Sequence, residues 1–344
     1  MATARELGLI VGGLPVGTLN AITDVAGVAV GHRTLSGDGL ATGVTAILPH
    51  AGDPFRLKPR AAVDVINGFG KSAGLIQVAE LGTIETPILL TNTFGVAACT
   101  QSLIRRAVAA NPEIGRSTST VNALVCECND GGISDIQAMG VTTEDADAAL
   151  DAASPGPFDQ GAVGAGTGMT AFGFKAGIGT SSRLMQIDGE DFTLGAMVLA
   201  NFGPAGQLVL PDGRRPAPDR DAEAEKGSVI VVLATDLPLG DRQLQRVARR
   251  AGAGLARLGA YWGHGSGDVA ICFTIADPVD HAPQSAFAPL RRLDDARIDI
   301  AFRAAAEATQ EAVLNALCEA PATQGRDGRL YPSLVDWLKE NPSR

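Results

Sequence analysis

Apolar residues follow two patterns along the chain, one typical of strands and one typical of helices. Glycines separate most of the segments that have either pattern. Short, mostly apolar runs predict buried strands, and longer stretches with apolar positions three and four apart predict helices. The predicted strands are residues 26–30, 43–48, 62–66, 87–91, 121–128, 192–201, 229–234 and 269–275, and the predicted helices are residues 72–81, 96–110, 145–153, 241–258, 294–320 and 331–340. This order predicts mixed strands and helices around one core, with long helices gathered near the C-terminus.

Two segments depart from this pattern. Residues 161–179 are rich in glycine and carry one charge, that of Lys175, so the backbone there must come close to another backbone or to a ligand. Residues 211–226 are rich in proline and charged side chains, which predicts a mobile surface loop. That loop ends abruptly at Gly227–Ser228, where a strand that is apolar on both faces begins.

Composition narrows the classes of function. The 344 residues are 45% apolar, enough for one large core, and the formal net charge of −10 argues against a nucleic-acid partner. No run approaches the roughly 20 apolar residues of a membrane helix, and the N-terminus lacks the pattern of a secretion signal. The five cysteines lie in apolar runs and the four histidines lack ligand spacing, so we expect buried thiols, a cytoplasmic protein, and neither metal nor cofactor.

The junction at Ser228 suggests a specific chemistry. If the bond after Gly227 opened, a serine with a free amine would stand on a rigid strand. An α-amine has a pKa of about 8, so near neutral pH it can accept the proton of its own residue's hydroxyl. Ser228 would then be nucleophile and base in one residue. A loop-to-strand turn with ordinary glycine and serine residues is the alternative interpretation.

Four sequence blocks around this junction resemble the L-aminopeptidase/D-esterase (DmpA-type) family, which includes the β-peptidyl aminopeptidases and the nylon-oligomer endohydrolases. The blocks are residues 127–131 (ECNDG), 161–169 (GAVGAGTGM), 227–239 (GSVIVVLATDLPL) and 265–268 (GSGD). The similarity extends from about residue 17 to the final helices. It implies a four-layer α/β/β/α sandwich formed by one domain, residues 1–344. It also implies self-cleavage into a large subunit, 1–227, and a small subunit, 228–344, and assembly into homo-oligomers, commonly tetramers.

The resemblance also implies roles for single residues. Ser228 corresponds to the nucleophile, and Asn201 to the side-chain donor that stabilises the oxyanion. Ser266 and Asp268 correspond to the pair that hydrogen-bonds the hydroxyl and amine of the nucleophile. Lys175 corresponds to a lysine with a function in the nylon-hydrolase branch. A fixed donor at the developing oxyanion lowers a reaction barrier by about 3–4 kcal/mol.

Glu127 corresponds to an acid that holds the free amine of the substrate in peptidase members. Those members commonly have an aromatic residue two positions later, where this chain has Asn129. The difference bears on specificity for β-peptides or ordinary peptides and leaves the cleavage chemistry unchanged. A carboxylate that caps a turn at the end of a strand is the structural alternative for Glu127.

The sequence thus predicts a self-processing hydrolase of small amine-bearing amides or short peptides, and of some esters. Two other interpretations stay open. Residues 70–74 fit the nucleophile-elbow pattern G-x-S-x-G, with Ser72 as nucleophile and His264 or His281 as its base, or else with Ser72 as a simple helix N-cap. The chain could also be an uncleaved scaffold that binds a small molecule.

Overall fold

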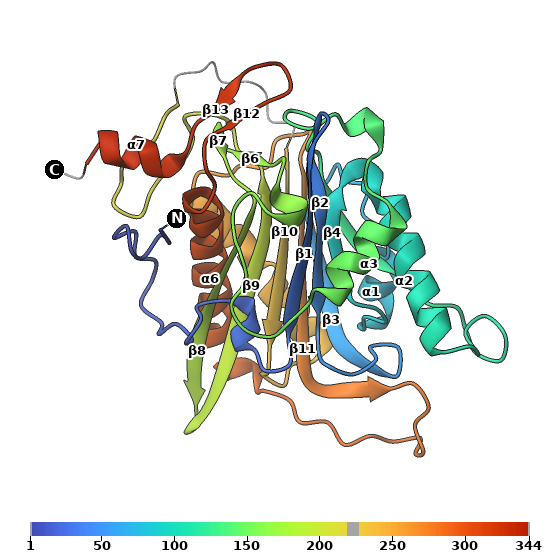
Figure 1. Ribbon diagram of the computed structural model, residues 1–344. Coiled ribbons are helices and arrows are strands. Elements are labelled where there is room, and N and C mark those ends of the chain that lie inside the picture. Colours follow the sequence, from blue (N-terminus) through green and yellow to red (C-terminus); the bar gives the residue numbers. More distant parts are fainter. Residues whose placement is uncertain (1, 219–226, 343–344) are drawn as a thin grey trace.

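The computed structural model describes residues 2–218 and 227–342 (Figure 1). Two mixed β-sheets lie face to face. The first has the strand order β1 (Ala29–Gly37), β2 (Leu40–Leu48), β4 (Ile88–Asn92) and β5 (Leu124–Cys128). The second has the order β3 (Leu57–Gly68), β11 (Gly267–Asp280), β10 (Ser228–Thr235), β9 (Glu190–Asn201) and β8 (Ile178–Ile187). We refer to them as sheet A and sheet B.

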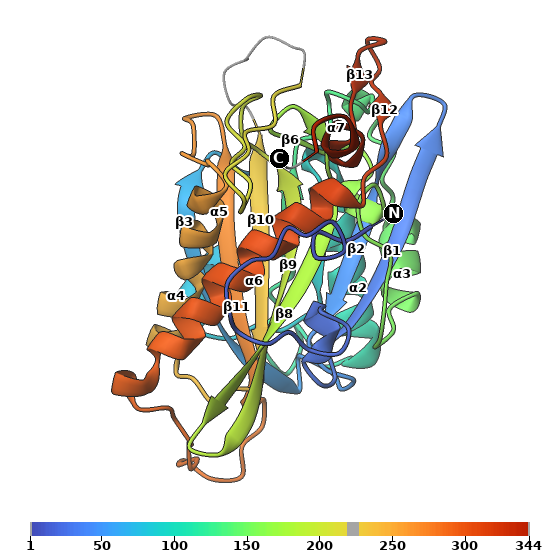
Figure 2. The same ribbon diagram turned by 90° about the vertical axis from the view of Figure 1, so that its left-hand side faces the viewer.

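Helices cover the outer face of each sheet and complete four layers (Figures 1 and 2). The helices on sheet A are α2 (Val96–Ala110) and α3 (Thr143–Asp151), while α1 (Leu75–Leu81) packs beside β3. The helices on sheet B are α4 (Asp241–Ala248), α5 (Arg250–Arg257) and α6 (Asp299–Cys318). One end of the sandwich carries α7 (Leu334–Glu340) and two short hairpins, β6 (Thr170–Ala171) with β7 (Phe174–Lys175) and β12 (Thr323–Gln324) with β13 (Leu330–Tyr331). The α/β/β/α sandwich that the sequence predicted is therefore confirmed.

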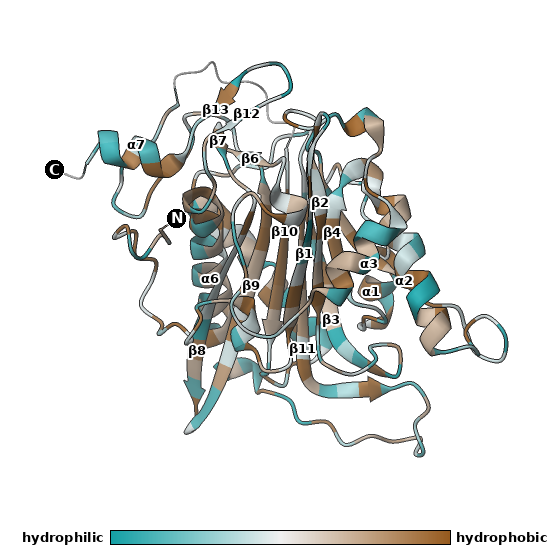
Figure 3. Cartoon of the chain, viewed as in Figure 1, coloured by the Kyte–Doolittle hydropathy of each residue, from teal (hydrophilic) through white to brown (hydrophobic). Residues whose placement is uncertain are grey.

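Strand β10 lies at the centre of sheet B and is apolar on both faces because both faces are covered. Ile230 and Val232 pack into the core between the two sheets, and Val229 and Val231 pack into the core under the helices. Burial from both sides explains why this strand reads as a continuous apolar run, which Figure 3 shows along the middle of the sandwich. A strand held in this way is a rigid support for its first residue, Ser228.

Strand β8 was not predicted, because its sequence is not apolar. Its middle is Thr180, Ser181, Ser182 and Arg183, which are all buried, and the strand packs against α6. The strand and the helix approach closely at Gly179, where a Cβ atom would lie 1.9 Å from the carbonyl oxygen of Ala312. The expectation that the glycines of residues 161–179 allow close backbone contact is confirmed at this position.

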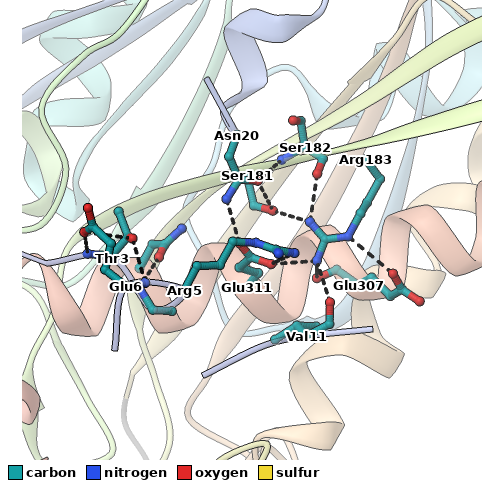
Figure 4. Close-up of polar contacts among 12 residues, drawn as sticks. Thr3, Arg5, Glu6, Val11, Asn20, Ser181, Ser182, Arg183, Glu307 and Glu311 are labelled. Atoms are coloured by element: carbon teal, nitrogen blue, oxygen red, sulfur yellow. Dashed lines mark hydrogen bonds and ion pairs between the residues drawn. The ribbon is translucent and has the colours of Figure 1, made fainter. Parts of the chain in front are cut away.

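A buried ion cluster joins α6 to β8 and to the N-terminal segment (Figure 4). The fully buried Arg183 donates to Glu311 at 2.7 Å and to Glu307 at 3.3 Å. Arg5 donates to the other oxygen of Glu311 at 2.6 Å, and Asn20 also donates to that oxygen. Because Glu307 and Glu311 are four residues apart, they share one face of α6. The cluster therefore ties the N-terminal segment and sheet B to the helix.

Most predicted element boundaries are accurate to a few residues, and three elements need comment. Helix 241–258 is two helices, which meet at Arg249. Helix 72–81 begins at Leu75 because its N-cap is Gly74, at φ +90°, so the interpretation of Ser72 as an N-cap was wrong. Of the predicted loop 211–226, residues 211–218 form turns and irregular chain, and residues 219–226 lie outside the described residues.

The five cysteines are all buried and free, as their apolar surroundings predicted. Among residues 2–218 and 227–342, no helix combines the length and the apolar character needed to cross a membrane. The same residues contain no group of three or more His, Cys, Asp or Glu side chains placed to hold a metal ion.

Candidate active site

Three neighbouring strands of sheet B bring Asn201, Ser228 and Gly267 into one row. Strand β9 runs antiparallel to β10 and pairs Asn201 with Ser228. Strand β11 runs parallel to β10 and pairs Gly267 with Ser228. The last residue of one strand and the first residues of two others therefore meet at the same edge of the sheet. Two of the four sequence blocks, separated by about 40 residues, come together there.

Ser228 is buried, with 5% of its surface exposed. Its Oγ atom accepts a hydrogen bond from the Gly267 amide at 3.2 Å. Its carbonyl oxygen accepts from Cys128 Sγ at 3.4 Å, which connects the start of β10 to the end of β5 in sheet A. Burial raises the pKa of the Cys128 thiol well above its ordinary value, so the thiol stays neutral and acts as a donor. Ser228 is thus held from both sheets.

The peptide between Gly227 and Ser228 is tightly enclosed. A Cβ atom at residue 227 would lie 2.0 Å from the carbonyl oxygen of Asn201, so only glycine fits there without displacement. The Gly227 carbonyl oxygen accepts from the Gly267 amide at 3.3 Å. The same Gly267 amide therefore lies near both the Ser228 hydroxyl and the carbonyl that this hydroxyl would attack.

Ser266 and Asp268 flank Gly267 and are fully buried. Ser266 Oγ donates to Asp268 Oδ1 at 2.7 Å, so the two side chains are in contact, as their spacing suggested. The backbone amide between these two residues, that of Gly267, is the group that contacts Ser228. The Asn67 side chain donates to the carbonyl of Ser266 and to that of Gly263 and so supports this turn.

The side-chain amide of Asn201 is fixed at both ends. Its Oδ1 accepts from the Thr170 amide at 3.0 Å, and its Nδ2 donates to the Asn129 carbonyl oxygen at 2.9 Å. A donor at one end and an acceptor at the other define the orientation of the carboxamide. The Nδ2 group has two hydrogens, so one N–H is not engaged by the Asn129 carbonyl.

Lys175 lies close to this group but does not reach Ser228 with its ammonium. Nζ donates to the carbonyl oxygens of Gly166 at 3.2 Å, Met169 at 2.9 Å and Ala176 at 2.5 Å. Burial lowers the pKa of the Lys175 ammonium to about 7, while the three carbonyls favour the protonated form, which alone has three N–H donors. All three donors are used within the glycine-rich segment.

Glu127 is the last but one residue of β5 and is almost completely buried, with 2% of its surface exposed. Its Oε1 accepts from the Lys71 amide at 2.8 Å, and its Oε2 accepts from the Thr93 hydroxyl. A carboxylate oxygen has further lone pairs, so each oxygen can also accept from a substrate ammonium. Asn129 contributes its carbonyl oxygen to Asn201 and uses its side chain to accept from the Gly131 amide at 2.9 Å.

Asp130 is a second buried acid in the block of residues 127–131. Both of its carboxylate oxygens accept from Asn92 Nδ2, at 3.0 and 3.3 Å. Burial raises the pKa of the Asp130 carboxyl to about 6, against the hydrogen bonds from Asn92, which lower it. The Asp130 side chain packs against Gly168: a Cβ atom added to Gly168 would lie 2.7 Å from the Cβ atom of Asp130. Asp130 thus braces the glycine-rich segment against β5.

The alternative nucleophile, Ser72, is placed differently. It lies in an extended stretch whose next residue, Ala73, pairs with Val125 of β5. The two histidines considered as its base have other neighbours. His281 shares a hydrogen bond with Thr118 at 3.1 Å, and the ring of His264 lies 6.0 Å from that of Phe69. Ser72 instead lines an apolar cavity of about 930 Å³ between β3 and α1.

The family model of peptidase family S58 matches residues 20–331, which is most of the chain. The chain belongs to peptidase family S58. The family is one of peptidases, so the prediction of a hydrolase that acts on peptide bonds is confirmed. The chain is similar to the β-peptidyl aminopeptidase BapA of Sphingosinicella xenopeptidilytica, with 38% identity over 349 residues, which cover 94% of this chain and 86% of the relative.

Solved structures of family S58 relatives agree with this assignment. The PH0078 protein from Pyrococcus horikoshii OT3 is 42% identical, with a TM-score of 0.92 over 98% of each chain. The L-aminopeptidase D-Ala-esterase/amidase from Ochrobactrum anthropi is 35% identical, with a TM-score of 0.88 over 99% of each chain. That structure is a variant of the Ntn hydrolase fold, and this family S58 chain has the same fold.

Sequence reasoning missed three groups at this site. The Gly267 amide was not predicted, because a backbone donor is located only by the register between β10 and β11. The Thr170 amide and the Thr93 hydroxyl were also missed. The sequence offered one signal for the Thr170 amide. Residues 161–169 form one of the four family blocks, which placed the segment just before Thr170 near the site.

Proposed function

We propose that the enzyme cuts its own chain between Gly227 and Ser228 and then uses Ser228 as an N-terminal nucleophile. One observation carries the proposal: the Ser228 hydroxyl and the Gly227 carbonyl share the Gly267 amide, at 3.2 and 3.3 Å. Attack of Oγ on the Gly227 carbonyl carbon would transfer the acyl group from nitrogen to oxygen. This shift breaks the Gly227–Ser228 C–N bond and frees the Ser228 amine. Water would then hydrolyse the ester, which releases the Gly227 carboxylate and regenerates the Ser228 hydroxyl. The products are residues 1–227 and 228–344.

In the cut enzyme, the Ser228 amine accepts the proton of Oγ as Oγ attacks the substrate carbonyl carbon. Negative charge develops on the carbonyl oxygen, and the remaining Nδ2 hydrogen of Asn201 donates to it. The amine then protonates the leaving nitrogen, and an acyl-Ser228 ester remains. Water attacks that ester, with the amine again as base, and the acid product leaves. The buried Ser266–Asp268 pair beside Gly267 supports orientation of the amine and stabilises its protonated form.

We propose small amides or short peptides with a free amine as substrates, and esters in addition. Glu127 supports this choice, because a buried acid next to Cys128, whose thiol donates to the Ser228 carbonyl, gains most by binding an ammonium group. The β-peptidyl aminopeptidase relatives are consistent with such substrates. We also propose that the cut protein is a cytoplasmic homo-oligomer, a tetramer as the family resemblance implies, which light scattering would test.

Denaturing mass spectrometry of freshly purified, active protein tests the central step. We expect two fragments that break before Ser228, and a single intact chain with full activity would reject the mechanism. Ser228→Ala should stay uncut and inactive. Ser72→Ala should be cut and active, since Ser72 lines the apolar cavity beside α1. Loss of activity with Ser72→Ala alone would favour the nucleophile-elbow enzyme instead.

A further inference from the structure

One peptide unit lies between Lys175 and Asn201. The carbonyl oxygen of this unit, on Met169, accepts from Lys175 Nζ at 2.9 Å. The N–H of the same unit, on Thr170, donates to Asn201 Oδ1 at 3.0 Å. A peptide group whose oxygen binds a cation becomes a stronger donor at its nitrogen, because the group polarises as a whole.

The chain of hydrogen bonds continues through the Asn201 carboxamide, which is also an amide. Its Oδ1 accepts from Thr170, and its Nδ2 donates to the Asn129 carbonyl oxygen at 2.9 Å. Polarisation at Oδ1 strengthens donation by both Nδ2 hydrogens. One of these hydrogens is the proposed oxyanion donor.

The burial of Lys175 also fits an indirect role. The side chain is completely buried, and its three N–H groups already donate to three backbone carbonyls. Direct contact with the oxyanion would break one of these three hydrogen bonds. The Gly166 and Met169 carbonyls also accept from backbone amides, whereas Lys175 supplies the hydrogen bond that satisfies the Ala176 carbonyl. From this buried position the Lys175 charge can act on Asn201 through the hydrogen bonds between them, without any movement of the side chain.

We propose that Lys175 is a positioning residue that orients and polarises Asn201 through the Met169–Thr170 peptide. The inference rests on the proposed function, since it assigns Asn201 to the oxyanion. In this role the ammonium does not touch the oxyanion itself. It also explains the glycine-rich segment, whose backbone brings three carbonyl oxygens to the Lys175 ammonium.

A double-mutant cycle tests the route. Asn201→Ala should lower kcat about 100-fold or more, as loss of one oxyanion donor does. Lys175→Met should lower kcat about three- to tenfold with little change in KM, because polarisation along a hydrogen-bond chain is a fraction of each bond. In the Asn201→Ala background, Lys175→Met should lower kcat less than twofold. Multiplication of the two single effects would overturn the inference.

Several measurements separate this role from damage to the fold. Each variant is assayed on the same p-nitroanilide and normalised to the cut fraction found by mass spectrometry. Thr167→Val is the matched control, because it removes a 2.6 Å hydrogen bond to Gly164 in the same segment but outside the relay. It should lower thermal stability and leave kcat within twofold. Loss of kcat equal to that of Lys175→Met would show a general effect of the segment and overturn the inference.

If Lys175→Met does not fold, nuclear magnetic resonance of uncut Ser228→Ala protein tests the same relay. The side-chain amide signal of Asn201 is assigned by its absence from the Ser228→Ala/Asn201→Ala protein. This signal should shift with pH around 7, where the buried Lys175 ammonium, whose pKa burial lowers to about 7, loses its proton. An Asn201 signal that does not respond to that titration would overturn the inference. Failure of the proposed function is recognised separately, by an intact and active wild-type chain.

Discussion

Arg183 and Glu311 form a fully buried ion pair of 2.7 Å that spans the proposed cleavage point. Arg183 lies on β8, in the part of the chain before Gly227, and Glu311 lies on α6, in the part after it. Arg5 and Asn20, also from the first part, bind the same carboxylate. After cleavage these contacts would join two separate chains, so the cluster holds the fragments together.

Arg183→Met should destabilise the protein by about 3–5 kcal/mol, because it leaves two buried carboxylates with fewer donors. We expect the free energy of unfolding in urea to fall by this amount in the uncut Ser228→Ala protein. The cut protein should in addition release its fragments in mild urea, as seen by gel filtration. Arg297→Met is the control, since its pair with Asp188 crosses the same cleavage point at the surface and should contribute less than about 1 kcal/mol. Equal effects of the two substitutions would contradict this role.

Glu127→Gln should raise KM about tenfold or more for substrates with a free amine, because a charge-assisted hydrogen bond is replaced by a neutral one. The KM of the corresponding N-acetylated amides should change less than twofold. Thr93→Val removes the hydroxyl that donates to Glu127 but keeps the charge, so it should affect the amine-bearing substrates less than Glu127→Gln does. The same change in KM for both substrate series would remove the amine-binding role.

The Asp130 carboxyl should make stability depend on pH between about 4 and 6. Its pKa is about 6 in the folded protein and near 3.8 when exposed, so the folded state binds more protons over this interval. The Asp130 carboxyl therefore contributes its full stabilisation below pH 3.8, the pKa of the exposed group. This contribution to the free energy of unfolding falls by up to about 3 kcal/mol as the pH rises through about 6, the pKa in the folded protein. The free energy of unfolding of the wild type minus that of Asp130→Asn should show this decrease in urea titrations. A difference that is constant from pH 4 to 7 would refute the prediction.

Gly227→Ala should slow self-cleavage at least tenfold and leave the uncut chain to accumulate. Its Cβ atom would lie 2.0 Å from the Asn201 carbonyl oxygen, so the peptide must move away from the Ser228 hydroxyl, and small displacements of reacting atoms cost about 100-fold in rate. Gly252→Ala on α5 is the control, since its Cβ atom meets nothing closer than 3.5 Å. The uncut fraction is followed by denaturing electrophoresis over time, and cutting of Gly227→Ala at the wild-type rate would rule out this steric effect.

The sequence alone determined the local features of this protein. The two-sided apolar run after Ser228 identified a central buried strand, the glycines of residues 161–179 indicated close backbone contact, and the order of four blocks indicated the family. These conclusions were available because apolar periodicity and glycine content report on each segment by itself. Helix α2 was predicted with its observed bounds for the same reason.

Only the tertiary structure decided which groups meet. The Gly267 amide reaches Ser228 through the register of two strands, and the Met169–Thr170 peptide reaches Asn201 through a turn of the glycine-rich segment. Strand β8 escaped prediction because its buried Arg183 is matched by carboxylates on α6, more than 120 residues away, and Thr180 and Ser182 are matched by groups of the N-terminal segment. A polar residue can be buried only where a partner satisfies it, and the identity of that partner is set by packing across the whole fold.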